Sequence, residues 1–293
     1  NTERIDYLFH HENLKLVYGD LSDYSSIASV IGDVKPDLFF NLGAMSHVKV
    51  SFDIPEYTMD ITGTGVIRCL EAIRKCSPKT RFLTSSSSEQ FGSSPPPQNE
   101  DTPFAPCSPY AVAKTAGYHA VINYRKSYNI FACNSICFNF ESPKRGETFV
   151  TRKITRAATR IKMGLQDKLY LGNLDSHRDW QHAKDAAKAM YLIINHDEAD
   201  DYVVANGHMR SVREFAELVF SKLDLDYKNY VEFDSRYLRP SEVDALCGDA
   251  SKIKTKLGWS PEYTFEMLVD EMIESDLKLA MDEKILKEHS LNK

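Results

Sequence analysis

The chain has 293 residues, which is enough to bury a large core in one big domain or in two coupled ones. Its apolar content of 42 % and its charged content of 27 % are ordinary for a globular protein. The net charge of -6 argues against a nucleic-acid-binding protein, because such proteins normally carry a basic excess. We therefore expect no nucleic-acid partner.

The six cysteines show neither a CxxC pair nor the spacing of zinc ligands. We therefore expect free thiols in a reducing compartment and no bound metal. No apolar run has the length of a membrane span, and no segment reads as a secretory leader. The cytoplasm is the expected location, without a membrane partner.

The first half of the chain predicts strands that alternate with helices. Helices are expected at 25–32, with Ser22 or Asp23 as the cap, at 54–75 and at 110–128. Strands without polar alternation, separated by helices, indicate a parallel sheet covered on both faces. This is the doubly wound, Rossmann-type α/β fold, which binds ligands at the carboxyl ends of its strands. The expected strands are residues 14–20, 37–43, 81–85 and 130–138.

The second half is less regular, with helices expected at 152–164, 212–223 and 265–283. We expect residues 141–293 to form mainly a smaller, C-terminal substrate-binding lobe, interleaved with a Rossmann-type domain of residues 1–140. The charged tail from residue 282 is expected to fray.

A dinucleotide fold normally contains a strand, a Gly-rich turn and a helix that cradle the pyrophosphate. Neither GxGxxG nor GxxGxxG occurs in the sequence. We therefore expect the Rossmann-type domain to be N-terminally incomplete, without its Gly-rich βα unit.

A locally basic region lies between residues 144 and 162, and two interpretations of it stay open. It is either a solvated helix face or a site for an anionic small molecule. Its basic residues are Lys144, Arg145, Arg152, Lys153, Arg156, Arg160 and Lys162.

Tyr110 and Lys114 stand four residues apart, directly after Ser108 and Pro109, which form a good helix start. Spacing of four puts both side chains on one helix face. An ammonium beside a phenol is expected to lower the phenol pKa, which suits a proton acceptor for a sugar hydroxyl. A bare YxxxK pattern is nevertheless frequent on helix surfaces.

A polar run at residues 84–92, TSSSSEQFG, follows directly after a predicted strand. A doubly wound fold has its ligand site at this end of a strand. The two elements together, in this order and about 20 residues apart, are far more specific than either alone.

The pair resembles the extended short-chain dehydrogenases that act on nucleotide sugars. Further strings narrow the resemblance to the GDP-mannose 4,6-dehydratase family. They are YGDL (18–21), NLGA (41–44), SHVKVSF (46–52), ESPKRG (141–146), FVTRKI (149–154), LGNLD (171–175), RDW (178–180) and RPSEVD (239–244).

The resemblance implies a hydro-lyase that makes a 4-keto-6-deoxy sugar from GDP-mannose without net oxidation. Tyr110, assisted by Lys114, would take the C4 hydroxyl proton of the hexose, while NADP⁺ would accept the C4 hydride. Glu89 would remove the C5 proton and protonate the leaving C6 hydroxyl. Ser87 would hydrogen-bond the C4 oxygen.

The resemblance also implies two binding sets and a homodimer or homotetramer. The expected cofactor-binding residues are Asp20, Leu21, Leu42, Gly43, Ala44, Ser46, Tyr57 and Arg145. The expected residues for the GDP-sugar are Asn139, Lys153, Arg178, Arg239 and Glu242.

Two positions depart from the family pattern, Met45 where glutamine is usual and Phe140 where histidine is common. The resemblance implies NADP as the cofactor, and these departures leave NAD open as the alternative. Two alternatives for the activity also stay open, a GDP-manno-heptose 4,6-dehydratase and a non-catalytic nucleotide-sugar-binding relative without a phosphate loop.

Overall fold

The computed structural model describes residue 2 and residues 4–291. Its centre is a four-stranded sheet in which all neighbours are parallel, in the order β1-β2-β3-β7. The register aligns Ser87 at the end of one strand with Cys137 at the end of the next. The strands are β1 (Leu38–Asn41), β2 (Arg81–Ser87), β3 (Ala132–Cys137) and β7 (Asp201–Val204).

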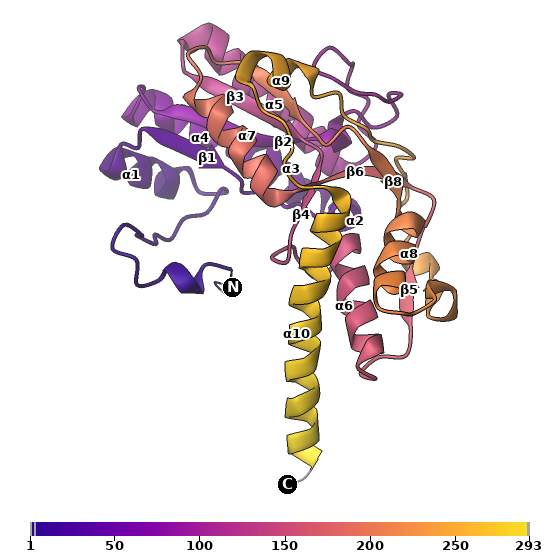
Figure 1. The fold of residues 1–293 in the computed structure, drawn as a ribbon. Helices are drawn as coiled ribbons and strands as arrows, with labels where there is room; N and C mark the ends of the chain where they lie inside the picture. Colours follow the sequence, from indigo (N-terminus) through magenta and orange to yellow (C-terminus); the bar gives the residue numbers. More distant parts are fainter. Residues whose placement is uncertain (1, 3, 292–293) are drawn as a thin grey trace.

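Helices cover both faces of this sheet (Figure 1). The side chain of Phe82 packs in the core on one face of the sheet, whereas the side chain of Leu83 packs in the core on the other face. This alternation is expected of a strand that is buried on both sides. The doubly wound α/β prediction is therefore confirmed. The helices are α1 (Tyr24–Val34), α4 (Gly65–Cys76) and α5 (Pro109–Tyr128) on one face, with α7 (Ala183–Asn195) and α9 (Ser251–Leu257) on the other.

Three further helices build a second core around Trp180, beside the sheet (Figure 1). They are α6 (Val150–Lys162), α8 (Val212–Lys222) and α10 (Phe265–Leu291). In this part β6 (His177–His182) lies between β4 (Asn139–Glu141) and β8 (Met209–Ser211), and β5 (Leu169–Leu171) pairs with β9 (Val231–Phe233). Short helices complete the chain, namely η1 (Asp6–Leu8), α2 (Val48–Asp53), α3 (Pro55–Met59), η2 (Asp60–Thr64), η3 (Ser88–Gln90), η4 (Tyr227–Asn229) and η5 (Ser235–Tyr237).

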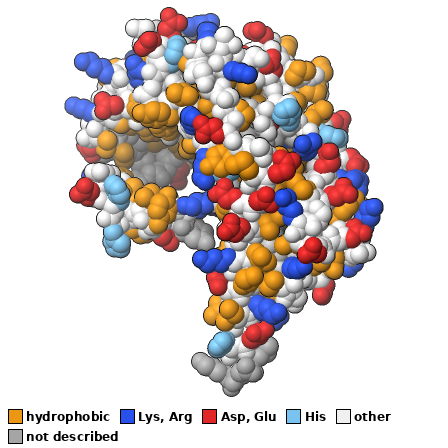
Figure 2. Space-filling view, viewed as in Figure 1, with side chains coloured by type: hydrophobic (Ala, Val, Ile, Leu, Met, Phe, Trp, Pro, Cys, Tyr) orange, Lys and Arg blue, Asp and Glu red, His pale blue; other side chains and the backbone are white. Residues whose placement is uncertain are grey.

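Helix α10 projects well beyond the body of the molecule, with α6 packed along part of its length (Figures 1 and 2). Residues 282–291, where fraying was expected, continue this helix to Leu291, and residues 292–293 lie outside the described residues. An ion pair between Arg160 and Glu283 fastens this part of α10 to α6. Within the described part of the chain, no helix combines the length and hydropathy needed to cross a membrane.

The predicted strand at residues 14–20 is wrong. The segment has no regular structure, and Leu16, Val17 and Tyr18 are more than half exposed. A strand needs a neighbour for its backbone hydrogen bonds, and this segment pairs with no strand in the described chain. Apolar composition alone therefore misled the prediction.

The predicted helix at 54–75 is interrupted by a π-helical turn over Asp60–Thr64. At this turn the backbone lies against α5, and a Cβ on Gly63 would stand 3.1 Å from the carbonyl oxygen of Ala113. The close approach of the two helices beside the site explains why a small residue occupies this position.

Candidate active site

The Ser-rich run places Ser87 at the carboxyl end of β2, where it caps the turn Ser88–Gln90. The Ser87 hydroxyl accepts a hydrogen bond from the Glu89 N–H at 3.3 Å. In return, the Gln90 side-chain oxygen accepts one from the Ser87 N–H at 2.8 Å. This reciprocal capping box fixes Ser87 and Glu89 relative to each other.

Tyr110 and Lys114 come from the first turns of α5, as their spacing predicts. Ser108 caps the helix by accepting a hydrogen bond from the Ala111 N–H at 3.1 Å, and Pro109 occupies the first turn. Both side chains are buried. The Lys114 ammonium donates to the Ser85 carbonyl at 2.5 Å and lies 5.9 Å from the centroid of the Tyr110 ring.

Burial dominates the protonation of this pair. It raises the pKa of Tyr110 to about 12, although hydrogen bonding to the Ser87 hydroxyl opposes the rise. Burial likewise lowers the pKa of Lys114 to about 8. The expected lowering of the tyrosine pKa by Lys114 is therefore wrong in this geometry, because desolvation of the phenolate outweighs the nearby charge.

The Glu89 carboxylate faces two arginines from the second half of the chain. Its Oε1 lies 3.5 Å from an Nη of Arg239 and 4.0 Å from an Nη of Arg178. Glu242 stands beside them, 3.2 Å from Arg178 and 3.3 Å from Arg239. Two carboxylates and two guanidiniums thus form one nearly charge-balanced cluster at the end of β2.

Arg178 is held tightly within this cluster, because it also donates to the carbonyls of His177 at 2.9 Å and of Val243 at 2.8 Å. Its burial lowers the pKa of the guanidinium. Arg239 is more accessible than Arg178. Arg178, Arg239 and Glu242 are therefore brought together with Glu89.

Lys153 and Asn139 do not join these contacts. The Lys153 ammonium donates to the Tyr170 carbonyl at 2.6 Å and lies 3.2 Å from the centroid of the Tyr237 ring. Burial lowers its pKa. Asn139 is half-buried on β4, directly after the sheet strand that ends at Cys137.

The residues expected at the cofactor gather around the end of β1. Leu42 is exposed, and the backbone at Gly43 runs so close to Leu21 that a Cβ would stand 2.6 Å from a Leu21 methyl. Ala44 and Ser46 continue this loop. The result is a shelf of small and apolar side chains.

Two expected cofactor residues at the margin have other surroundings. The Asp20 carboxylate accepts hydrogen bonds from the backbone and the hydroxyl of Ser22, both at 2.8 Å, and these bonds lower its pKa. Tyr57 is about half exposed on α3. Within the described residues, neither side chain contacts the cluster of Glu89, Glu242, Arg178 and Arg239.

Arg145 reaches the shelf from the other side. Its guanidinium stacks 3.7 Å from the centroid of the Phe149 ring, and Phe149 contacts His47 at the end of the shelf loop. Its Nε lies 3.2 Å from a carboxylate oxygen of Glu141, yet it is buried without a hydrogen-bond partner. The Arg145 guanidinium, on a side chain that is 24 % exposed, lies near the buried Tyr110 phenol and fits a nicotinamide dinucleotide, whose phosphates need cationic donors.

Two residues that support the site were missed from sequence. Gln90 completes the capping box, and the S-x-x-Q pattern of residues 87–90 is a signal that could have found it. Cys137 lies buried beneath Lys114, with its sulfur 3.1 Å from the Ser135 hydroxyl. The apolar run around Cys137 reads as ordinary core, so the sequence carries no signal for it.

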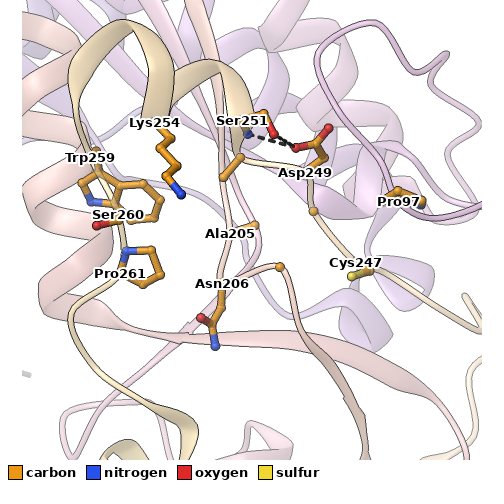
Figure 3. A pocket seen from close by; sticks show the side chains of 13 residues that line it. Pro97, Ala205, Asn206, Cys247, Asp249, Ser251, Lys254, Trp259, Ser260 and Pro261 are labelled. Atoms are coloured by element: carbon orange, nitrogen blue, oxygen red, sulfur yellow. Dashed lines mark hydrogen bonds between the residues drawn. The ribbon is translucent and has the colours of Figure 1, made fainter.

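A pocket of about 400 Å³ is lined mainly by residues 205–207, 247–251 and 259–261. Figure 3 shows Lys254, Trp259 and Pro261 on one wall and Pro97 and Cys247 on the other. None of the predicted site residues lines this pocket.

Asp179, next to Arg178 on β6, contacts the loops that line this pocket. Its carboxylate accepts hydrogen bonds from three backbone N–H groups of the pocket wall, at Asn206, Gly207 and Gly248. Burial nevertheless raises the pKa of Asp179 to about 6. Neighbouring side chains on a strand point to opposite faces, so Arg178 serves the cluster while Asp179 serves the loops behind it.

Comparisons with solved structures show the same fold at low sequence identity. RMD from Pseudomonas aeruginosa, complexed with NADPH, superposes with a TM-score of 0.82 at 24 % identity, covering 91 % of this chain and 90 % of that one. The dTDP-glucose 4,6-dehydratase of Bacillus anthracis, in complex with NAD, has a TM-score of 0.82 at 23 % identity, covering 95 % and 84 %.

Comparisons with curated sequences are much closer. The chain is 52 % identical to GDP-mannose 4,6 dehydratase 2 of Arabidopsis thaliana over 98 % of its own length and 79 % of the relative's. It is 46 % identical to the GDP-mannose 4,6-dehydratase of Vibrio cholerae serotype O1, over 100 % and 88 %. The family model described as GDP-mannose 4,6 dehydratase matches residues 1–272. The chain therefore belongs to the GDP-mannose 4,6-dehydratase family.

Proposed function

We propose that this protein is a hydro-lyase that converts GDP-mannose to GDP-4-keto-6-deoxymannose. The observation that carries the proposal is the position of the Glu89 carboxylate. It lies at the end of β2 and faces Arg178 and Arg239. It is also close enough to the buried Tyr110 phenol for its negative charge to raise the pKa of that phenol. A dehydration needs such a carboxylate, whereas an epimerisation or a simple reduction at C4 does not.

The chain's residues divide the proton transfers of this reaction. Tyr110 accepts the proton of the C4 hydroxyl, and the positive charge of Arg145 favours the phenolate that this step requires, with the Lys114 ammonium 5.9 Å from the ring centroid. Ser87 donates its hydroxyl hydrogen bond to the C4 oxygen. Glu89 removes the C5 proton, which a C4 ketone makes acidic, and passes a proton to the departing C6 hydroxyl. A bound nicotinamide supplies the reversible hydride transfer between C4 and C6.

We propose NADP as the cofactor, with NAD as the alternative. The expected shelf residues, from Asp20 and Leu21 to Leu42, Gly43, Ala44, Ser46 and Tyr57, would contact its adenosine and diphosphate portions. Arg145, whose side chain is 24 % exposed, would meet a phosphate with its guanidinium. Support comes from the fold neighbours, which are complexed with NADPH in one case and with NAD in the other.

The proposed nucleotide-sugar site is built mainly by the second half of the chain. Arg178 and Arg239 are suited to the diphosphate of a GDP-sugar, with Glu242 holding both guanidiniums in place. Lys153 and Asn139 would contact the same ligand from α6 and β4.

We also propose a division into a cofactor-binding domain of residues 1–140 and a mainly sugar-nucleotide-binding lobe of residues 141–293. The two parts are interleaved, because β7 of the second half pairs with β3 in the central sheet and α9 packs against a face of that sheet. The separate core around Trp180 supports this division.

Incubation with GDP-mannose and no added reductant tests the activity. We expect mass spectrometry to find a product that has lost one water. If GDP-mannose is unchanged while a GDP-manno-heptose loses water, the heptose enzyme is correct. If no GDP-hexose or GDP-heptose loses water, the hydro-lyase proposal fails and a non-catalytic binding relative takes its place.

We further propose a homodimer or homotetramer in the cytoplasm. The oligomer rests on resemblance to the family. The compartment is supported by the cysteines, all six of which are free thiols. Sedimentation velocity measures the oligomeric state, and microscopy of a tagged chain in its host cell shows the compartment.

A further inference from the structure

A buried ion pair joins α6 to α10 on the side of the molecule that carries Arg145. The Arg152 Nε lies 2.8 and 3.0 Å from the two carboxylate oxygens of Asp276, whose side chain is fully buried. The Thr155 hydroxyl donates to the same carboxylate at 2.6 Å. Arg152 is thus not part of the solvated helix face that its basic neighbourhood suggested.

The other end of the Arg152 guanidinium holds a loop. Its Nη1 donates to the carbonyl of Pro143 and, at 3.0 Å, to that of Arg145. A guanidinium has five N–H donors in a rigid plane, so it can satisfy a carboxylate and two carbonyls at once. One buried side chain therefore links α10 to the backbone of Arg145.

This loop decides where Arg145 points. The Arg145 side chain is confined between the Phe149 ring and the buried carboxylate of Glu141, which in turn accepts a hydrogen bond from the Thr151 hydroxyl at 2.6 Å. A shift of the Arg145 backbone would move its guanidinium relative to both groups.

We propose that Arg152, held by Asp276, is a positioning residue that fixes residues 143–145 so that Arg145 faces the cofactor phosphate. The proposal rests on the proposed cofactor role of Arg145. Asp276 neutralises the buried guanidinium, because an unpaired buried charge is strongly destabilising. Asp276 lies beyond residue 272, where the match to the family model ends. It therefore acts on the proposed nucleotide site only through Arg152, without touching the nucleotide.

The main test compares Arg152→Lys with a matched control on the same two helices. Lysine can pair with Asp276, but it cannot also reach both carbonyls in the plane of a guanidinium. The control is Glu283→Gln, which removes the more exposed ion pair with Arg160 and leaves residues 143–145 untouched. The probe is NADPH, titrated by its own fluorescence against the full chain.

We expect Arg152→Lys to raise the Kd for NADPH about tenfold or more, as the loss of a charge-assisted hydrogen bond would. The Kd for GDP should stay within about twofold, and Glu283→Gln should bind both like the wild type. Unchanged NADPH binding by a folded Arg152→Lys variant would overturn the proposal.

A double variant without either charge tests the proposal if Arg152→Lys fails to fold. The double variant Arg152→Met with Asp276→Leu replaces a buried ion pair by apolar groups, a change that is often neutral for stability. It leaves the carbonyls of residues 143 and 145 without their donor. Backbone amide exchange over residues 142–149 should be about tenfold faster in this variant, whether or not NADPH binds, and wild-type exchange rates would contradict the proposal.

The variant Arg145→Ala separates this proposal from the function on which it rests. If Arg145→Ala weakens NADPH binding and the Arg152 variants do not, only the positioning role is wrong. If Arg145→Ala binds NADPH like the wild type, the cofactor role of Arg145 is wrong and the positioning role falls with it.

Discussion

Glu89 is a buried carboxylate in contact with two arginines that belong to the other half of the chain. Such an arrangement holds the carboxylate in one place while leaving it in reach of a bound sugar. Its backbone is fixed independently, because the capping box of Ser87 and Gln90 sets the turn on which it sits. Both halves of the chain therefore hold this carboxylate in place.

The variant Glu89→Gln should lose dehydration of GDP-mannose by about 10²-fold or more in kcat, the usual contribution of a positioned acid–base group. Glutamine has the shape of glutamate but cannot accept the C5 proton. Product formation by mass spectrometry measures the loss, and thermal melting checks that the fold is kept. Wild-type turnover in this variant would show that another group is the base.

Lys114 should give the protein a pH-dependent stability. Below pH 8 the buried ammonium is charged in the folded and the unfolded chain, so the full cost of burying it is present. Between pH 8 and pH 10.5 the folded chain releases this proton first, and stability therefore rises with pH. The rise expected from this shift is about 3 kcal/mol.

Urea unfolding of the wild type and of Lys114→Met, below pH 8 and near pH 10.5, measures this effect. The wild type should gain about 3 kcal/mol relative to the variant over this interval. Lys126→Met, at an exposed position of the same helix, keeps Lys114, so the difference between this variant and the wild type should not vary with pH. A difference between wild type and Lys114→Met that does not vary with pH would contradict the burial argument.

Helix caps connect local sequence to the site. Ser108 caps α5 two residues before Tyr110, whereas Asp23 caps α1, which carries none of the proposed catalytic residues. Replacing either cap by alanine should cost about 1 kcal/mol of stability. Only Ser108→Ala should also lower kcat, because fraying of the first turn displaces the phenol.

Chemical denaturation and steady-state kinetics on both variants check this prediction. A fall in kcat for Asp23→Ala as large as that for Ser108→Ala would mean that lost stability, and not the position of Tyr110, reduces the activity.

Elements with a strong local signal were predictable from sequence. The cap and proline before α5, the Asp23 cap of α1 and the apolar runs of β1, β2 and β3 lie where expected. The short strands of the second half, such as β4, β6 and β7, were not predicted, because they are defined by pairing partners distant in the chain. The same reason explains why residues 14–20 do not form a strand despite their apolar pattern.

The features of the site also divide into those with a local sequence signal and those that depend on distant parts of the chain. Tyr110 and Lys114 share a helix face because of their spacing, and Ser87 and Glu89 share one turn. Glu89 contacts Arg178 and Arg239, which follow it in the chain by 178 − 89 = 89 and 239 − 89 = 150 positions. No local sequence pattern could predict contacts over such separations. The burial of Arg152 against Asp276 depends on the packing of α6 against α10, which a run of basic residues does not reveal.

At the scale of the whole molecule, the chain passes repeatedly between its two cores. β6 contributes Trp180 to the second core, and α7 follows it directly on the sheet. β7 then pairs in the sheet, β8 and α8 return to the second core, α9 returns to the sheet and α10 leaves it again. Neither core is complete in one continuous stretch of chain, so we expect them to unfold together.

The two tryptophans report on this directly. Trp180 is buried in the second core and Trp259 in the sheet core, and they are the only tryptophans of the sequence. In the single-tryptophan variants Trp259→Phe and Trp180→Phe, fluorescence should therefore follow one core at a time during urea unfolding. We expect the two midpoints to agree once each is compared with far-ultraviolet circular dichroism of the same variant, as for one cooperative transition. A tryptophan signal that changes well before the circular dichroism would show that its core unfolds separately, and the interleaving of the two parts would then not couple their stabilities.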